Sequence, residues 1–420
     1  MRYLWRGDAR VPQTTPRKER SIVNGRNTSR RIDSPSDTKA VMISVSTTIH
    51  DIATAPAALR ASIESHMASM DAHAEIPQDL HAELREAGVF RMLTPREYGG
   101  LAAPLSSALT VYEDLAHIDA SVGLVTWNAN FGFIGALLSP LGAQRIWDGS
   151  TAPVFANSGM PGTATPDNQG YRINGRWRLV SGVHHADWIV LVVIVAGPGG
   201  TPLVKGAVVH RDQITIHQAW DVTGLRGTGS HEITVEDVLV PGELVFGFDD
   251  PVRVDGDLYQ GFIPALVFPG CTAVALGVAR RALSETVALI GNKPSMTGRL
   301  ADSPRVQYAI AKHESAVAAA RLLLHAAVGE LEGAANRHEP VTLAQRAALR
   351  AAMTHAAEVS REALVSAYQL ASSTALFRSH PLERIFRDGM ATLQHANHSA
   401  LFMEAAGRAR LGLDPGVPLF

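Results

Sequence analysis

The chain has 420 residues, with 38 Lys and Arg against 40 Asp and Glu, a formal net charge of −2 and a single cysteine. This length allows two or three subdomains, while the charge balance excludes a basic nucleic-acid face and the lone cysteine excludes a disulfide framework or thiolate zinc site. The nearest approach to a membrane span is the apolar run Trp188–Ala196, which is only strand length. We therefore expect a cytoplasmic protein with no membrane or nucleic-acid partner.

The first 45 residues are rich in Arg, Ser, Thr and Pro and show no hydrophobic period. This composition predicts a disordered tail, or a mis-called start with Met42 as the true first residue. Residues 46–149 then show helical spacing of apolar residues, which predicts an N-terminal helical domain. Its expected helices are 57–70, 78–86, 106–118, 121–138 and 141–147.

Residues 150–257 change to a period of two, which is typical of strands. Tyr171–Trp177 predicts a hairpin, because Asn174-Gly175 is a favoured two-residue turn. The other expected strands are 188–195, 205–210, 214–218 and 232–240. Because no helical pattern intervenes, we expect a central antiparallel sheet or barrel.

Residues 258–420 predict four long helices with short connections, which indicates a C-terminal four-helix bundle. The expected helices are 262–290, 304–332, 343–373 and 381–411. In the last of them, helical spacing would place five residues on one stripe, either as a salt-bridged rim or as part of a site. They are Arg384, Asp388, Ala391, His395 and His398.

Three motifs stand out, namely residues 220–230 followed by 235–241, Ala301–Gln307 and Glu383–Asp388, and with them the chain resembles the acyl-CoA dehydrogenase superfamily over residues 47–412. Residues 220–230, followed by 235–241, resemble the signature at the end of that family's β domain. Ala301–Gln307 resembles its D-x-P-x-V-Q stretch, and Glu383–Asp388 resembles its E-R-I-Y-R-D stretch. The resemblance implies an α+β fold with an N-terminal α domain, a central antiparallel β domain and a C-terminal four-helix bundle.

Two departures from the dehydrogenase pattern carry chemical information. Ala396 stands where the dehydrogenases keep their catalytic Glu, Val267 stands where other relatives keep it, and no acid occurs from 258 to 284. Proton abstraction therefore has no base at either position. In addition, Gln369–Ala375 and Gly291–Met296 lack the glycines and the arginine with which the family holds the adenosine half of FAD. We therefore expect FMN as the flavin, with FAD as the alternative.

A third departure resembles the flavin-dependent monooxygenases of this superfamily, the two-component group D type. Gly175-Arg176-Trp177, Ser181-Gly182 and Trp188 follow their pattern, and His395 lies seven residues after the aspartate of the E-R-I-Y-R-D motif, as theirs does. The resemblance implies the oxygenase component of a homotetrameric enzyme. A flavin reductase would supply reduced flavin, and O2 would form a flavin C4a-hydroperoxide that hydroxylates a small aromatic substrate of the phenol or indole type.

The same resemblance implies roles for individual residues. Ser181 would bond the flavin N5 region, and His395 would contact the substrate or the peroxide. Ser158 and His185 occupy family flavin positions, whereas Arg226 either holds the flavin phosphate or caps a strand. Trp127 and Asn130 interrupt an apolar helix, so they either line the substrate pocket or bond between helices. No metal site is expected.

Four other interpretations stay open at this point. The first three are an acyl-CoA dehydrogenase with an unrecognised base, an N- or S-oxygenase on the same fold, and a degenerate family member that acts as a non-enzymatic binding or scaffold protein. The last alternative is a metal site formed by His395 and His398 with His184 and His185.

Overall fold

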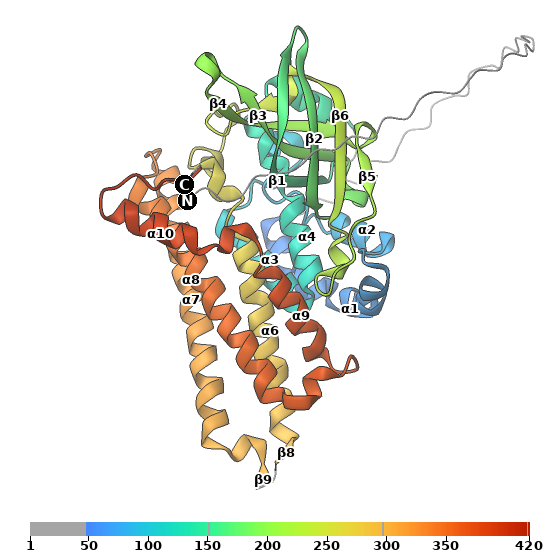
Figure 1. Ribbon diagram of the computed structural model, residues 1–420, viewed down its shortest axis with the longest axis vertical. Helices are drawn as coiled ribbons and strands as arrows, with labels where there is room; N and C mark the ends of the chain where they lie inside the picture. Colours follow the sequence, from blue (N-terminus) through green and yellow to red (C-terminus); the bar gives the residue numbers. More distant parts are fainter. Residues whose placement is uncertain (1–47, 150–151, 296–297, 418) are drawn as a thin grey trace, which may run out of the picture. The chain divides into compact units, whose positions relative to one another are not determined.

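The computed structural model describes residues 48–149, 152–295, 298–417 and 419–420. They belong to one compact unit, Ser46–Phe420, in which helices precede and follow a central sheet (Figure 1). This order confirms the predicted α+β fold class. The predicted boundaries at 149/150 and 257/258 stay predictions, and the prediction made for residues 1–45 lies outside the described residues.

The N-terminal helices follow the predicted order with one difference. They are α1 (Ile49–His73), α2 (Gln78–Glu86), α3 (Leu105–Ile118), α4 (Ala120–Ala129) and α5 (Pro140–Ile146). The predicted helix 121–138 ends at Ala129, and a short 3₁₀ helix, Phe131–Ala136, follows. Asn130 interrupts the helix because its side-chain amide donates to the Thr126 and Val89 carbonyls, 2.8 and 2.7 Å away.

Within the described residues, seven strands form the central sheet in the order β5-β6-β2-β1-β3-β4-β7. They are β1 (Phe155–Asp167), β2 (Gly170–Val180), β3 (Trp188–Ala196), β4 (Pro202–His210), β5 (Thr215–His217), β6 (His231–Pro241) and β7 (Val245–Phe246). The sheet is not antiparallel throughout, because β1 and β3 are parallel. The turn 181–187 passes the start of β1, where Asp187 and Val154 exchange hydrogen bonds of 2.8 Å, and so brings β3 to the free edge of β1.

The predicted turn at Asn174-Gly175 is wrong. Both residues lie inside β2, where the register against β6 shifts between Ile173 and Gly175. The Asn174 side-chain oxygen accepts the backbone N–H of Asp237 at 2.7 Å, so the pair belongs to a β-bulge. The observed hairpin turns at 167–170 and is preceded by β1, a strand that sequence patterning missed because it contains two prolines and a bulge between Ser158 and Gly162.

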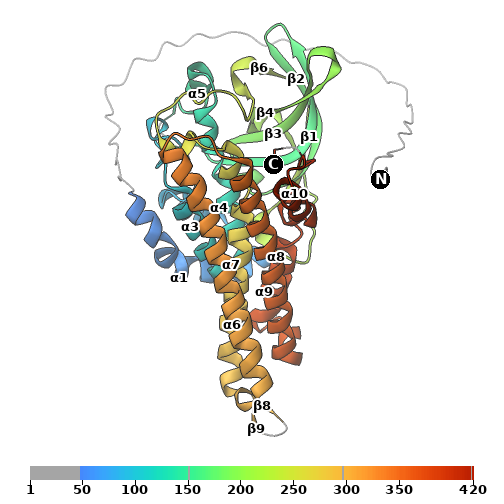
Figure 2. The ribbon, with the colours of Figure 1, turned by 90° about the vertical axis from the view of Figure 1, so that its left-hand side faces the viewer.

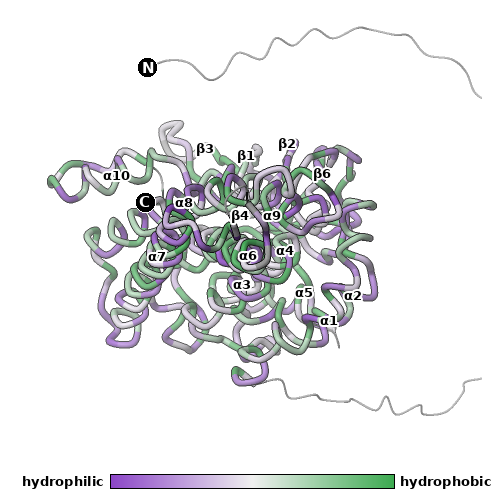
Figure 3. The backbone as a smooth tube through the Cα atoms, turned by 90° about the horizontal axis from the view of Figure 1, so that it is seen from below, coloured by the Kyte–Doolittle hydropathy of each residue, from purple (hydrophilic) through white to green (hydrophobic). Residues whose placement is uncertain are grey.

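The C-terminal helices α6, α7, α8 and α9 run alongside one another (Figure 2). They are α6 (Gly270–Asn292), α7 (Pro304–Asn336), α8 (Leu343–Ala371), α9 (Pro381–Thr392) and the following α10 (Ala400–Arg410), with the short strands β8 (Pro294–Ser295) and β9 (Gly298–Arg299) between α6 and α7. The stretch Ile263–Gly291 is long and apolar enough to cross a membrane, which sequence inspection overlooked. However, 83% of its most apolar window is buried, and α6 lies in the middle of the surrounding helices (Figure 3).

The single predicted helix 381–411 is also wrong, because it breaks after Thr392. His395 accepts the backbone N–H of Asn397 through Nδ1 at 3.2 Å, and Ser399 caps α10 through Leu401. These local side-chain bonds compete with helix continuation. Arg384 and Asp388 therefore share a face of α9, whereas His395 and His398 belong to the separate turn that follows.

A largely buried ion-pair cluster joins α9 to the N-terminal helices through Arg384, and to the loop before β6 through Asp388, which accepts the N–H of Leu225 at 2.7 Å. Arg384 donates to Asp119 at 2.6 Å, to the Met67 carbonyl at 2.6 Å and to Asp388 at 3.3 Å. Asp119 in turn caps α4 by accepting the N–H groups of Ser121 and Val122 at 2.9 and 3.1 Å. This cluster therefore fixes where α1, α4 and α9 meet.

We expect Arg384→Met to destabilise the fold by roughly 3–5 kcal/mol, because it leaves the buried Asp119 and Asp388 carboxyls without their cation. Urea unfolding followed by circular dichroism measures this loss. The matched control is Arg299→Met, which breaks an exposed surface pair with Asp302 and should leave the free energy of unfolding almost unchanged. Equal losses in the two variants would contradict a central role for Arg384.

Candidate active site

Two turns and one helix bring three of the predicted residues together. The first turn, 181–187, joins β2 to β3, and the second, 395–399, joins α9 to α10. Helix α4 touches both, since the Trp127 indole meets the His395 ring edge-on at 5.1 Å and Asn128 donates to the Ser181 carbonyl at 2.7 Å. Because Trp127 and Asn128 are consecutive, Ser181 and His395 flank the same turn of α4.

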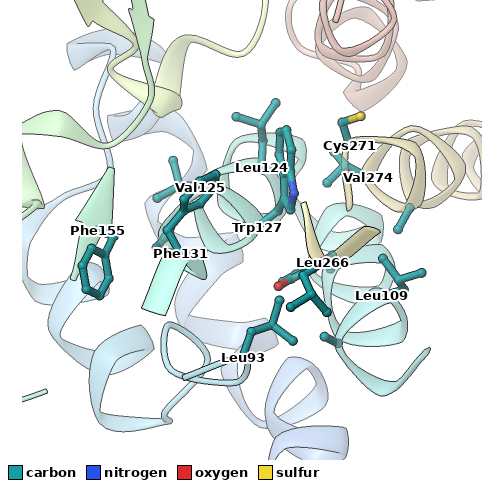
Figure 4. Close-up of a cluster of buried hydrophobic side chains, with 14 of the residues drawn as sticks. Leu93, Leu109, Leu124, Val125, Trp127, Phe131, Phe155, Leu266, Cys271 and Val274 are labelled. Carbon is teal, nitrogen blue, oxygen red and sulfur yellow. The ribbon is translucent and has the colours of Figure 1, made fainter. Parts of the chain in front are cut away.

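The surroundings of Trp127 are apolar (Figure 4). The buried side chains drawn there include Leu93, Leu109, Leu124, Val125, Phe131, Leu266, Cys271 and Val274. The indole N–H itself donates to the Val267 carbonyl at 2.8 Å, so the ring is held in one position by α4 and by the segment before α6. Trp127 therefore presents a fixed aromatic wall to the His395 turn.

His395 is held as a neutral imidazole with a defined tautomer. Its Nδ1 accepts the N–H of Asn397, so the single proton of the neutral ring resides on Nε2. Burial lowers the pKa of His395 to about 4, well below the ordinary value. At neutral pH the side chain can therefore donate one hydrogen bond through Nε2 without carrying charge.

His398 has a different position from its neighbour. It is buried, and its Nε2 lies 3.2 Å from the Thr272 hydroxyl of α6. Burial, together with the nearby His395 ring, lowers its pKa to about 3. His398 is thus a packing residue that joins the turn to α6, and it does not belong to a salt-bridged helix rim, one of the two possibilities left open for the stripe.

Ser181 begins a chain of buried hydroxyls. Its Oγ lies 2.7 Å from that of Ser230, which lies 2.6 Å from the hydroxyl of Thr228. Thr228 donates to the Leu225 carbonyl at 2.8 Å. We call Ser181, Ser230 and Thr228 the hydroxyl relay.

The relay reaches a pocket of about 670 Å³ through Ser230. Leu179 and Trp220 supply apolar lining, and Arg176 and Arg178 supply cations. Leu179 is 62% exposed, and its backbone is held at φ +60°. A large apolar side chain in the left-handed region costs free energy, which makes this outward Leu a candidate ligand contact.

Ser158 and Arg226 lie at this pocket and at its neighbour. The Ser158 hydroxyl on β1 donates to the Arg178 carbonyl at 3.1 Å, beside the wall of the first pocket. Arg226 lines a second pocket of about 720 Å³, where it donates to the Asp71 and Val222 carbonyls at 2.5 and 3.0 Å. Val222 lines both pockets, so they are adjacent.

Two predicted ligand contacts are engaged by the protein itself. The Asn130 amide bonds the backbone of Val89, Leu93 and Thr126. The two His185 ring nitrogens lie 3.1 and 2.8 Å from the Gln78 side chain and the Ile76 carbonyl. These contacts fix α4 and the first turn against the N-terminal helices, and the ligand roles of both residues stay predictions.

Sequence inspection missed four polar residues that support the site. Asn157 on β1 donates to the side chain and carbonyl of Asn128, at 2.6 and 3.0 Å. Thr228 and Ser230 form the relay. Buried amides and hydroxyls need partners, so polar residues in apolar segments were a usable signal. The hydrogen bonds that join them to the site, Asn128 to Ser181, Asn157 to Asn128 and Ser230 to Ser181, span 29 to 53 positions of sequence, however, and only the folded chain identifies them.

The positions that matter for the other interpretations are also defined. Ala396 and Val267 carry no carboxylate; Ala396 is exposed, and the Val267 carbonyl accepts the indole N–H of Trp127. Across the described residues, no group of three or more His, Cys, Asp and Glu side chains is placed to hold a metal ion.

Comparison with known proteins identifies the class of protein to which this chain belongs. Family models of the acyl-CoA dehydrogenase N-terminal and C-terminal domains match residues 52–145 and 270–400. Indole-3-acetate monooxygenase of Pseudomonas putida is 31% identical over 359 residues, which cover 84% of this chain and 91% of that protein. The oxygenase component of an FADH(2)-dependent resorcinol hydroxylase from Rhizobium sp. (strain MTP-10005) is 26% identical and covers 81% of this chain and 89% of that protein.

Among solved structures, XiaF from Streptomyces sp. in complex with FADH2 and glycerol has the same fold. Its TM-score is 0.82 at 22% identity, covering 88% of this chain and 97% of that one. The chain therefore has the acyl-CoA dehydrogenase fold. It belongs to the flavin-dependent monooxygenase branch of the acyl-CoA dehydrogenase superfamily, which confirms the resemblance found in the sequence.

The buried histidines predict acid sensitivity. The folded-state pKa of His398 is about 3, so the unfolded chain binds a proton below about pH 6.5 while the folded chain does not. Stability therefore falls as pH falls, by about 1.4 kcal/mol per such histidine between pH 7.5 and 5.5. His398→Gln keeps a donor for Thr272 and should remove about that much of the pH dependence measured by urea unfolding.

The control for this measurement is His50→Gln, which alters an exposed histidine on α1. It should leave the pH dependence of the unfolding free energy unchanged. A His398→Gln protein with the same pH dependence as the wild type would show that His398 is not held neutral in the folded chain.

Proposed function

We propose that this chain is the oxygenase component of a two-component flavin monooxygenase that hydroxylates a small aromatic substrate of the phenol or indole type. The observation that carries the proposal is the convergence of Ser181, Trp127 and His395 on one turn of α4. Membership of the monooxygenase branch and the absence of a carboxylate at Ala396 and Val267 support it.

The residues present fit a flavin. A planar ring system needs an apolar surface and a few polar groups at its edge. Leu179 and Trp220 offer the first, and the Ser181 and Ser230 hydroxyls offer the second. Arg176 and Arg178 both pair with Glu232 in the same pocket, and their remaining N–H groups are the donors that would receive a phosphate there. When bound, reduced flavin supplies the electrons that activate O2 for transfer to the substrate.

The chain's own residues would bind the substrate, orient it and exclude water from it. The Trp127 indole offers an edge and a face against which an aromatic ring packs. His395 offers a neutral Nε2–H donor to a substrate oxygen or nitrogen, which aligns the ring and polarises it. The apolar side chains around Trp127 keep water away from the ring (Figure 4). A site without water prevents the activated oxygen from being lost before it reaches the substrate.

FMN is the flavin that the loop after α8 favours. In this chain, residues 369–375 carry side chains where the family has glycines, and the loop closes on α6. Lys293 donates to the Ala371 carbonyl at 2.5 Å and to the Thr374 hydroxyl at 2.8 Å. Met296, in the other altered stretch, lies outside the described residues.

Three further proposals concern the protein's surroundings. A separate flavin reductase supplies the reduced flavin. The Rhizobium relative supports this, because it is the oxygenase component of an FADH(2)-dependent hydroxylase. The protein is a cytoplasmic homotetramer. Exposed apolar side chains on α7 and after α8 support self-association, since single chains rarely expose many. They are Tyr308, Leu322, Leu323, Leu376 and Phe377.

His395→Asn tests the role of the imidazole. Asn preserves the acceptor that caps Asn397 but removes the Nε2–H donor, so we expect the turn to fold and hydroxylation to slow by roughly 100-fold. The measurement is product formed per O2 consumed, with a flavin reductase, NADH, FMN and a panel of phenols and indoles.

His210→Asn is the matched control. His210 also accepts a backbone N–H two residues on, from Asp212 at 3.4 Å, and also meets an indole edge-on, that of Trp188 at 4.9 Å, but it stands at the end of β4. It should hydroxylate like the wild type. Normal hydroxylation by His395→Asn would refute the assigned role, and no product from the wild type with any substrate would refute the function.

The choice of flavin is tested by anaerobic titration. Reduced FMN should bind at least as tightly as reduced FAD, because the loop that would receive the adenosine is filled by side chains and held by Lys293. Fluorescence or equilibrium dialysis gives the two dissociation constants. Binding of FAD more than about tenfold tighter, equivalent to 1.4 kcal/mol, would show that the adenosine is held after all.

A further inference from the structure

Arg350 of α8 is a buried cation without a carboxylate partner. Among the described residues it is the only Lys or Arg that is buried, with 2% of its surface exposed. No Asp or Glu of the described residues pairs with it, and its hydrogen bonds go to neutral oxygens, those of the Asn397 side chain at 3.4 Å and the Leu419 carbonyl at 3.3 Å. Charged side chains are rarely buried without a counter-charge, so this arrangement requires an explanation.

The groups that surround the guanidinium do not neutralise it. Its carbon atom lies 3.6 Å from the centroid of the Phe268 ring and 4.2 Å from that of the Phe402 ring. Aromatic faces attract a cation but carry no net charge. The nearby Cys271 is no counter-ion either, because burial raises the pKa of its thiol to about 12 and the thiol stays uncharged at neutral pH. The described side chains therefore leave the positive charge of Arg350 uncompensated.

This charge lies directly behind the candidate active site. Asn397 contacts Arg350 through its side chain and His395 through its backbone N–H, at 3.2 Å. Phe268 follows the residue whose carbonyl accepts the Trp127 indole N–H. Two residues of chain span no more than about 7 Å. Asn397 and Phe268 are only half-buried, so a short side chain on a ring held at Trp127 and His395 can reach the guanidinium past them.

We propose that Arg350 binds a carboxylate of the substrate, and that the substrate is therefore an aromatic ring with a short acidic side chain. This inference rests on the proposed function, because it takes the ring to lie against Trp127 and His395. A carboxylate gives the planar guanidinium the charged acceptor that the chain itself does not supply. The Asn397 side chain is held by long contacts of 3.4 and 3.5 Å, so it yields to the carboxylate and donates to it through Nδ2.

Arg350→Met separates a binding role from a structural one. It removes the charge and keeps an unbranched side chain between the two phenylalanine rings. It leaves no carboxyl unpaired, in contrast to Arg384→Met, and a buried charge without a partner does not stabilise a fold. We therefore expect the urea midpoint of Arg350→Met to be no lower than that of the wild type.

Arg346→Met is the matched control. Arg346 lies one turn earlier on α8 and also stacks on a phenylalanine ring, that of Phe262 at 5.1 Å. It also donates to a carbonyl near the end of the chain, that of Phe420 at 3.0 Å. In contrast to Arg350, it forms no hydrogen bond with the turn that carries His395, as far as the described residues show. It should therefore use substrates as the wild type does.

The test uses pairs of substrates that have the same size and differ in charge. They are indole-3-acetate with indole-3-acetamide, and 4-hydroxyphenylacetate with its amide. We measure kcat and KM for hydroxylation by each full-length protein, with a flavin reductase, NADH and FMN. The wild type and Arg346→Met should use the acid of a productive pair at least about tenfold more efficiently in kcat/KM than the amide. Arg350→Met should bring this ratio close to one, because KM for the acid rises while the amide is unaffected.

The other outcomes separate the two proposals. Equal efficiency of the wild type with acid and amide, an unchanged ratio in Arg350→Met, or an equal loss in Arg346→Met overturns the carboxylate site and leaves the proposed function standing. A structural role for Arg350 would lower the urea midpoint and the rates with acid and amide together, which also overturns the site. No product from the wild type with any phenol or indole overturns both proposals. If Arg350→Met does not fold by circular dichroism, Arg350→Gln replaces it, with the same expectation for the ratio.

Discussion

The largely buried guanidinium of Arg384 is the contact on which the arrangement of the molecule depends. It holds two buried carboxyls, those of Asp119 and Asp388, and a carbonyl of α1. Burial and the neighbouring Asp119 raise the pKa of Asp388 to about 6, which shows how strongly these acids need their cation. Such a cluster contributes less to net stability than to uniqueness, because only one packing of α1, α4 and α9 satisfies all its members.

Both turns of the active site depend on this cluster. Asp119 caps α4, which then carries Trp127 to one turn and Asn128 to the other. Asp388 receives the N–H of Leu225, where the hydroxyl relay to Ser181 begins. The structural motif shared with the dehydrogenases and the residues that we propose to act in oxygen transfer are therefore parts of one hydrogen-bonded system.

The desolvation of His395 and His398 supports the proposed chemistry and lowers the stability of the fold in acid. Desolvation keeps the half-buried ring of His395 neutral, and this leaves Nε2 as an uncharged donor beside the Trp127 indole. Desolvation also keeps the buried His398 neutral against α6. A site that must remain dry for oxygen transfer thus makes the fold sensitive to acid, since the unfolded chain gains protons that the folded chain refuses.

The sequence by itself determined the α, β, α order, most helix positions and the family, because periodicity and motifs report local burial and local geometry. It also singled out Ser181 and His395. Only the tertiary structure decided the break after Thr392, the parallel pairing of β1 with β3 and the bulge at Asn174-Gly175. It alone identified Asn128, Thr228 and Ser230 as partners of the site. The physical reason is that a hydrogen bond between residues tens of positions apart leaves no periodic pattern in the sequence. The direction of such a bond depends on which acceptor the donor group meets in the folded chain.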